Sequence, residues 1–374
     1  MHSQEGSFMK LFLNIKASVT VVLLVAVCGV SAYAQHSNLT NVSTIASTVP
    51  GNGDVNPYGI ARVPKTNGSL TEGNILVSNF NSSANLQGTG TTIVQITPSG
   101  TVSLFAQINA STLPGPCPGG IGLTTALAAL SSGWVIVGSL PTTDGTSATA
   151  QAGCLLVLNS SGSVVETFYG SLINGPWDMT ALDAGSTANL FVTNVLNGTV
   201  AAGGNVVWGG TVVRLNLTGL YTSTPTLESM TVIGSGFAEE TNSAALVIGP
   251  TGVGLSPDSS TIYVADSINN RVQWISDPVT RTTSGGTGST LTSDTTLNDP
   301  LGLTVLTDGS VVTVNGNNGY LLGFSTSGWQ QEQKLLDDNG TPPGSGALFG
   351  LVHVPGQGLY YVDDATNTLN LWLQ

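Results

Sequence analysis

The chain has 374 residues, a formal net charge of −13 and only 8% charged residues. Nucleic acids and anionic membranes bind proteins through concentrated Lys and Arg, which neutralise phosphate groups. Beyond the N-terminal segment the basic residues form no cluster, so both partners are excluded, and the acidic excess indicates solubility. These residues are Arg62, Lys65, Arg214, Arg271, Arg281 and Lys334.

Residues 1–34 have the three parts of a secretory signal peptide. Lys10 and Lys16 form the basic part, residues 19–30 the apolar part, and Ala32-Tyr33-Ala34 the small-x-small cleavage site. The uncharged run 17–30 is shorter than the roughly 20 residues of a membrane-spanning helix, although an uncleaved anchor remains the alternative. We expect a secreted, periplasmic or cell-surface protein with no membrane insertion after cleavage.

Residues 35–374 are predicted to form a single β domain. Val, Thr, Ser, Asn and Gly dominate this part, and few stretches have the Ala, Leu, Glu and Lys content of surface helices. Helix should therefore be nearly absent.

A four-residue pattern recurs six times, about every 50 to 75 residues: Pro or Leu, any residue, Gly or Asp, then an aliphatic residue. Each copy is followed by a β-prone run that ends in a small polar residue, and then by further β-prone runs. Four short antiparallel strands with a period near 50 are typical of propeller blades. The copies are Pro57–Ile60, Pro118–Ile121, Pro176–Met179, Pro250–Val253, Pro300–Leu303 and Leu348–Leu351.

The ends of the repeat predict how the ring closes. The sixth copy runs out after its third strand, while the β-prone stretch Asn41–Thr48 precedes the first copy. One twisted sheet cannot bury both of its faces, so neighbouring sheets pack around a closed ring. We therefore expect an all-β, six-bladed β-propeller of four-stranded antiparallel blades, in which Asn41–Thr48 completes the last blade.

Residues 258–275, DSSTIYVADSINNRVQWI, resemble the NHL repeat. In that repeat a strand ends in a small residue and Asp, before an Asn-rich turn and a strand that opens with Arg. Residues 303–324 are similar, with Asn315 in the place of Asp266. The resemblance implies a six-bladed propeller of the broader regucalcin, gluconolactonase and virginiamycin B lyase superfamily.

Enzymes of that superfamily use residues that this chain largely lacks. Peptidyl-hydroxyglycine lyases hold zinc with several histidines, and the chain has three: His2, His36 and His353. The first-blade Glu-Gly-Pro pattern of lactonase-like members is replaced by Asn56-Pro57-Tyr58. His353, in the inner strand of the last blade, is a candidate general base beside Asp364, and a hydrogen-bonded packing role is the alternative.

Small polar side chains end the second strand of each predicted blade. If they converge on the axis, Asp266 and Asp364 with neighbouring amides could bind Ca²⁺, which takes six to eight oxygen ligands. Turn preference at strand ends explains the same residues without a metal. The six are Asn79, Ser139, Asn194, Asp266, Asn315 and Asp364.

In antiparallel blades, the loop entering the first strand and the loop leaving the second strand share one face. The long segments 81–90, 141–153 and 197–210 fall on this face, and long loops on a rigid scaffold often carry recognition. Tyr58 and Trp177 either contact a ligand there or fill the spaces between blades. The candidate ligand-binding residues are Tyr58, Asn79, Trp177, Asp178, Asn194, Trp208, Asp266, Asn315 and Asp364.

Cys117 and Cys154 flank the predicted first and second strands of the second blade on this face. Export permits a disulfide between them, and two buried free thiols are the alternative.

These features favour a non-catalytic, exported binding or scaffold propeller for a glycan, a peptide or a protein, and we expect a monomer. The alternative is a divalent-cation-dependent hydrolase or lyase, lactonase-like, with its site at the mouth of the central channel.

Overall fold

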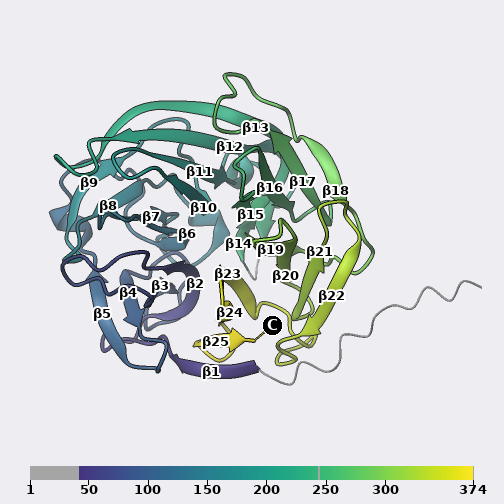
Figure 1. Cartoon of the computed structure of the whole chain (residues 1–374), viewed down its shortest axis with the longest axis horizontal. Coiled ribbons are helices and arrows are strands. Elements are labelled where there is room, and N and C mark those ends of the chain that lie inside the picture. The colour runs from purple at the N-terminus through teal and green to yellow at the C-terminus, as the bar shows by residue number, and fades with distance from the viewer. Residues whose placement is uncertain (1–41, 243–244, 374) are drawn as a thin grey trace, which may run out of the picture. The chain divides into compact units, whose positions relative to one another are not determined.

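The computed structural model describes residues 42–242 and 245–373, which form six antiparallel sheets around a central axis (Figure 1). Helix in these residues is limited to α1 (Thr199–Ala202) and the 3-10 segments Ala110–Thr112 and Ser147–Thr149. The predicted all-β, six-bladed propeller is confirmed. The predicted signal peptide, residues 1–34, lies outside the described residues. Within the described ranges, no helix has the length and apolar character needed to cross a bilayer.

Each blade runs outwards from an inner strand to the rim. The inner strands of blades 1–6 are β2 (Val55–Arg62), β6 (Leu123–Ala129), β10 (Pro176–Asp183), β15 (Pro250–Leu255), β19 (Pro300–Val305) and β23 (Leu348–Val354). The second strands are β3 (Ile75–Asn81), β7 (Val135–Ser139), β11 (Ala188–Asn194), β16 (Thr261–Asp266), β20 (Val311–Asn315) and β24 (Gly358–Asp363). The third strands are β4 (Thr92–Ile96), β8 (Leu155–Leu158), β12 (Val207–Thr218), β17 (Arg271–Ser276), β21 (Tyr320–Phe324) and β25 (Thr368–Trp372). The outer strands are β5 (Val102–Gln107), β9 (Val164–Phe168), β13 (Thr226–Asn242), β18 (Ser289–Thr292), β22 (Gln330–Leu335) and β1 (Val42–Ser47).

The residue pattern of each strand follows its depth in the blade. The second strands β3 and β24 are buried at every position, because neighbouring blades cover both faces. Their continuous apolar runs place Val, Ile, Leu and Tyr between the sheets, where burial stabilises the ring. The outer strand β22, QQEQKL, alternates between half-buried and exposed positions, because only one of its faces is covered.

The ring closes through the outer strand of blade 6. β1 pairs antiparallel with β25, from Val42 opposite Trp372 to Ser47 opposite Thr368. Figure 1 shows this contact as the purple β1 beside the yellow β25. The predicted closure by an N-terminal strand is confirmed.

The strand register corrects one copy of the repeat. Leu127 takes the place in blade 2 that Ile60 has in blade 1. Leu127 pairs with the residue two before Ser139, and Ile60 pairs with the residue two before Asn79. The blade 2 copy is therefore Thr124–Leu127, and the predicted copy Pro118–Ile121 lies in the loop before β6. Pro118 and Gly120 match the four-residue pattern by chance, because Pro and Gly are common in loops. The copy defined by the register, Thr124–Leu127, contains neither residue type.

The register also shifts one strand-end residue. Leu348 at the start of β23 pairs with Asp363, as Pro300 pairs with Asn315 in blade 5. Asp363 is thus the sixth strand-end residue, and the predicted Asp364 is the next residue, in the loop.

Blade 3 has five strands instead of the predicted four. Its outer strand β13 continues for 17 residues, and the end of this strand pairs with β14 (Leu246–Ile248). Leu246, Val247 and Ile248 are buried in one cluster with Tyr58 and Trp177 from the inner ends of blades 1 and 3. The apolar segment after β13 therefore packs at the axis instead of forming a surface loop.

The predicted disulfide between Cys117 and Cys154 is present. It ties the loop before β6 to the start of β8, across a sequence separation of 37 residues. Breaking a link that closes a loop of this length removes about 3–4 kcal/mol of stability in the chain-entropy treatment. We expect the double variant Cys117→Ser/Cys154→Ser to lose this amount in chemical denaturation. An unfolding midpoint equal to that of the wild type would contradict the prediction.

Candidate functional site

Three long loops, residues 82–91, 140–154 and 195–206, lie on one face of the propeller, which is called the loop face below. The first two are joined by hydrogen bonds from Thr142, whose N–H donates to Gly88 O (3.0 Å) and whose hydroxyl donates to Gln87 O (2.6 Å). Leu140 and Leu196 link the second and third loops through the same apolar cluster. The loops of blades 1–3 therefore form one continuous surface.

An aromatic plug closes the channel at the loop face. Tyr58 is 2% exposed and stacks between Phe80 and Phe349, with ring centroids 4.4 and 3.8 Å away. Trp177 is 4% exposed, and its indole N–H donates to Val247 O (3.1 Å) in β14. The sequence left two alternatives for Tyr58 and Trp177, contact with a ligand or packing between blades. In the structure both side chains are buried and fill the space between the blades.

Four of the six predicted strand-end residues bind the backbone of the loop that enters their own blade. Each of these four holds this loop against the end of the second strand, so the contact recurs in blades 1, 2, 3 and 5. The pairs are Asn79 Nδ2 with Thr48 O (3.1 Å), Ser139 Oγ with Gly120 O (2.8 Å), Asn194 Oδ1 with Asn174 N (2.9 Å) and Asn315 Oδ1 with Asn298 N (3.1 Å).

Asp266 lies in an ion pair within blade 4. Its carboxylate accepts from Arg271 Nε at 2.7 Å, and Asn269 donates to both of its oxygens. Burial raises the pKa of Asp266, while Arg271 and Asn269 oppose the shift. Among residues 42–242 and 245–373, no three His, Cys, Asp or Glu side chains group closely enough to hold a metal ion. The Ca²⁺ site at Asp266 and Asp364 thus stays a prediction, with no cluster of ligands around it in this part of the chain.

Asp364 lines a shallow pocket of about 470 Å³ on the loop face, between blades 1 and 6. Its Oδ1 atom is buried without a hydrogen-bond partner among the described residues. Burial and, secondly, the neighbouring Asp363 raise the pKa of Asp364 to about 8. The remaining lining is made of amides, hydroxyls and small residues: Val55, Asn56, Ser83, Asn85, Ser345, Gly346, Ala365 and Asn367.

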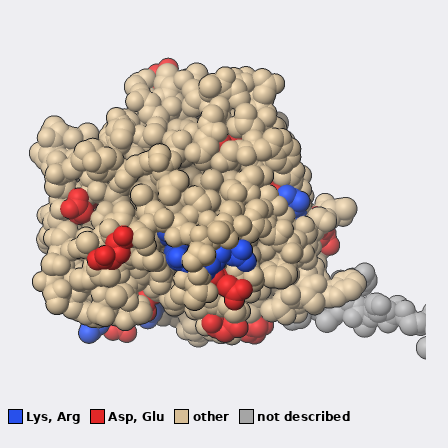
Figure 2. Space-filling view, turned by 90° about the horizontal axis from the view of Figure 1, so that it is seen from above, with Lys and Arg blue, Asp and Glu red and all other residues tan. Residues whose placement is uncertain are grey.

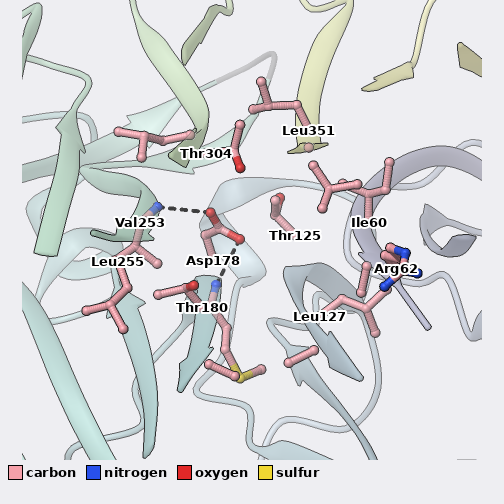
Figure 3. A pocket seen from close by; sticks show the side chains of 18 of the residues that line it. Ile60, Arg62, Thr125, Leu127, Asp178, Thr180, Val253, Leu255, Thr304 and Leu351 are labelled. Carbon is pink, nitrogen blue, oxygen red and sulfur yellow. Dashed lines mark hydrogen bonds between the residues drawn. The ribbon is translucent and has the colours of Figure 1, made fainter. Parts of the chain in front are cut away.

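A second cavity, of about 270 Å³, runs along the axis behind the aromatic plug. The inner strands of all six blades line it, and its polar side chains are Arg62, Thr125, Asp178, Thr180 and Thr304. Figure 3 shows Asp178 near the middle of these residues, with hydrogen bonds to the backbones of Val253 and Met179.

Asp178 is 8% exposed and is held by two backbone donors. Val253 N–H donates to Oδ2 at 3.0 Å and Met179 N–H donates to Oδ1 at 2.8 Å. Burial raises the pKa of Asp178 to about 7, although both donors favour the ionised form. The carboxyl group therefore changes its charge near neutral pH.

His353 does not lie beside Asp364. It pairs with Leu359 near the end of β23, whereas Asp364 follows the residue opposite Leu348, at the start of this strand. Burial lowers the pKa of His353, and Asp308 of blade 5 opposes the shift. The prediction that these two side chains are neighbours is wrong, because the strand places them at opposite ends of the blade.

Trp208 remains on the loop face as predicted, and it is 65% exposed beside Val206, which is 40% exposed. Sequence reasoning missed Thr125 and Arg62 in the axial cavity. Thr125 was missed because the repeat copy of blade 2 was assigned to Pro118–Ile121 instead of Thr124–Leu127. Arg62 could have been noticed, because a basic residue in an inner strand is unusual in a chain with only 8 Lys and Arg residues.

The sequence matches no protein-family model and no curated protein. Solved structures match over most of the chain. A gluconolactonase from Xanthomonas campestris matches with a TM-score of 0.52 and 12% identity, covering 88% of each chain. The calcium-binding protein regucalcin from Agrobacterium tumefaciens matches with a TM-score of 0.55 and 13% identity, over 88% of this chain and 93% of its own. Virginiamycin B lyase from Staphylococcus aureus matches with a TM-score of 0.52 and 12% identity, over 88% and 98%. This chain therefore has the fold of the six-bladed propellers represented by gluconolactonase, regucalcin and virginiamycin B lyase.

Proposed function

We propose that this protein is an exported binding module that takes a neutral glycan in the loop-face pocket beside Asp364. The observation that carries the proposal is the lining of this pocket by amides and hydroxyls around one partly buried carboxyl group. Sugars present many hydroxyls, and each can donate to and accept from such groups. No Lys, Arg or His lines the pocket, which argues against a phosphate or carboxylate ligand.

The protonation of Asp364 suits an uncharged ligand. With a pKa raised to about 8, the carboxyl group is mostly protonated at pH 7 and can donate one hydrogen bond while it accepts another. Its buried Oδ1 atom has no partner among the described residues, and a sugar hydroxyl would supply one. The low charge of the chain, with 8% charged residues, fits a neutral partner, and the upper part of the face in Figure 2 is almost free of red and blue side chains.

We expect Asp364→Ala to weaken glycan binding at least about tenfold, because a buried hydrogen-bonded contact is lost. The measurement is binding of the protein without residues 1–34 to immobilised neutral oligosaccharides at pH 7. The matched control is Glu72→Ala, which removes an exposed acid from the connection between β2 and β3, outside the pocket, and should bind like the wild type. Equal binding by Asp364→Ala and the wild type would refute the role of this pocket.

Trp208→Ala tests how far the ligand extends over the loop face. Trp208 belongs to blade 3, while the pocket lies between blades 1 and 6, so only a long glycan reaches both. Loss of binding to long but not to short oligosaccharides would show stacking on this indole.

The alternative is a divalent-cation-dependent hydrolase or lyase at the mouth of the channel. The likeness of the fold to structures named gluconolactonase and regucalcin favours it. In this chain, however, Tyr58, Trp177 and Phe349 occupy the mouth. A rise in melting temperature with Ca²⁺ that Asp266→Ala abolishes would support this alternative over the binding module.

A further inference from the structure

Asp178 occupies a position at which the other blades exclude a long side chain. In blades 4, 5 and 6, a Cβ atom added at this position would overlap a backbone carbonyl of the next inner strand. The other five blades have glycine or alanine at this position, so the blade fold does not require a carboxylate there. The equivalent residues are Gly59, Ala126, Gly252, Gly302 and Gly350.

The carboxylate of Asp178 has no cationic partner among the residues that the structure describes. Its hydrogen bonds come from two uncharged backbone N–H groups, and the ion pair found among the described residues joins Arg271 to Asp266 instead. A buried carboxylate without a positive partner is costly. Such a group is a candidate for binding a ligand that brings the missing charge.

Thr125 supplies a second unsatisfied group at the same end of the cavity. It is 3% exposed, and its Oγ1 atom has no hydrogen-bond partner among the described residues. Thr125 also lines the small void beneath the aromatic plug, so it forms the closed end of the axial cavity. An ammonium group, with three donors, suits a site with a carboxylate and a free hydroxyl oxygen.

Arg62 lies towards the other end of the cavity. It is three residues beyond Gly59, the blade 1 counterpart of Asp178, which corresponds to roughly 10 Å along a strand. Its Nε atom is buried without a partner among the described residues. A guanidinium group pairs most strongly with a carboxylate, through two parallel hydrogen bonds.

We propose that the axial cavity binds a small linear amino acid, with its ammonium group on Asp178 and Thr125 and its carboxylate on Arg62. The cavity volume of about 270 Å³ accommodates a short ligand, so we choose β- and γ-amino acids, which carry their two charged groups at opposite ends of a short methylene chain. Ile60, Leu127, Val253 and Leu351 line the cavity and would contact the methylene groups. The site is separate from the loop-face pocket and does not depend on the function proposed for it.

Isothermal titration with 4-aminobutanoate at about pH 8 tests the proposal. We expect binding that is at least about tenfold tighter than that of butylamine or butanoate, because each of these lacks one charged end. Asp178→Gly should abolish binding while it preserves the fold, because glycine occupies this position in four other blades. Arg62→Gln should reduce binding to the level of butylamine, while the exposed neighbour Lys65→Gln should have no effect.

Three results would overturn this assignment. The first is the absence of any heat of binding when 4-aminobutanoate or β-alanine is titrated up to about 10 mM, which would mean that the cavity holds water alone. The second is unchanged binding by Asp178→Gly or, should that variant unfold, by Asp178→Asn. The third is loss of amino-acid binding in Asp364→Ala, which should affect only the glycan. Failure of glycan binding with retained amino-acid binding would refute the loop-face proposal alone.

Discussion

The protein should be markedly more stable at about pH 5 than at about pH 8.5. Several buried carboxyl groups have raised pKa values, with burial as the largest cause in each. These values are about 7 for Asp178, Glu239 and Asp299, about 6 for Asp363 and about 8 for Asp364.

The sign of the effect follows from proton binding. In the folded protein these groups stay protonated up to pH 6–8, whereas in the unfolded chain they ionise near their model values of 3.8 for Asp and 4.5 for Glu. The folded state therefore binds more protons between about pH 4 and 8, and its stability falls as the pH rises through that window. One group shifted by three pKa units corresponds to about 4 kcal/mol, so several together exceed about 5 kcal/mol.

Melting temperatures measured at about pH 5 and pH 8.5 should differ by about 10 °C, with the higher value at pH 5. Glu239→Gln should flatten this dependence, because Glu239 is fully buried and its Oε2 atom has no partner among the described residues. Asp258→Asn is the matched control. Ser256 and Ser260 hold the pKa of this exposed carboxyl group at about 2, so it keeps one charge state throughout the window. A melting temperature that rises towards pH 8.5 would show that the buried acids are ionised in the folded state.

Gly302→Ala should destabilise the propeller by about 4 kcal/mol or more, at the upper end of overpacking effects. A Cβ atom at Gly302 would overlap the carbonyl oxygen of Phe349, which belongs to the backbone of the next inner strand. Neither strand can move aside without separating blades 5 and 6. Chemical denaturation of the variant measures the loss.

Gly51→Ala is the control for this substitution. A Cβ atom at Gly51 would meet nothing within 4 Å, and the residue lies outside the inner strands. Stability within about 0.5 kcal/mol of the wild type is expected for it. Equal effects of the two substitutions would mean that the approach of neighbouring blades does not limit stability.

The sequence predicted the architecture because each blade repeats the same local pattern. The closure strand was accessible for the same reason: a β-prone stretch before the first copy and a missing strand after the last one can only complement each other. Blade 3 was harder to predict, because the apolar run Leu246–Ile248 breaks the period and its burial depends on Tyr58 and Trp177 from distant segments. The only sign of this extra strand in the sequence was the unusually long spacing between the repeat copies that begin at Pro176 and Pro250.

The candidate sites were less accessible, because they depend on register and on contacts between blades. A shift of one residue separates the strand-end Asp363 from the pocket-lining Asp364, and residue type alone cannot distinguish them. Asp178 was a candidate as part of the repeat, but its place in the axial cavity follows from the approach of six inner strands. The ion pair of Asp266 with Arg271 shows the converse case, in which a conspicuous acid is satisfied within its own blade.

The pairing of β1 with β25 has a consequence for biogenesis. Thr44 and Asn370, which are hydrogen-bonded in the folded protein, are 326 positions apart, so a ribosome makes one long before the other. Residues 42–47 therefore stay without their partner until residues 368–372 have been made, and the ring cannot close before that point. Until then blade 6 lacks its outer strand, so the final step of ring closure joins the two segments of the domain that are made furthest apart in time.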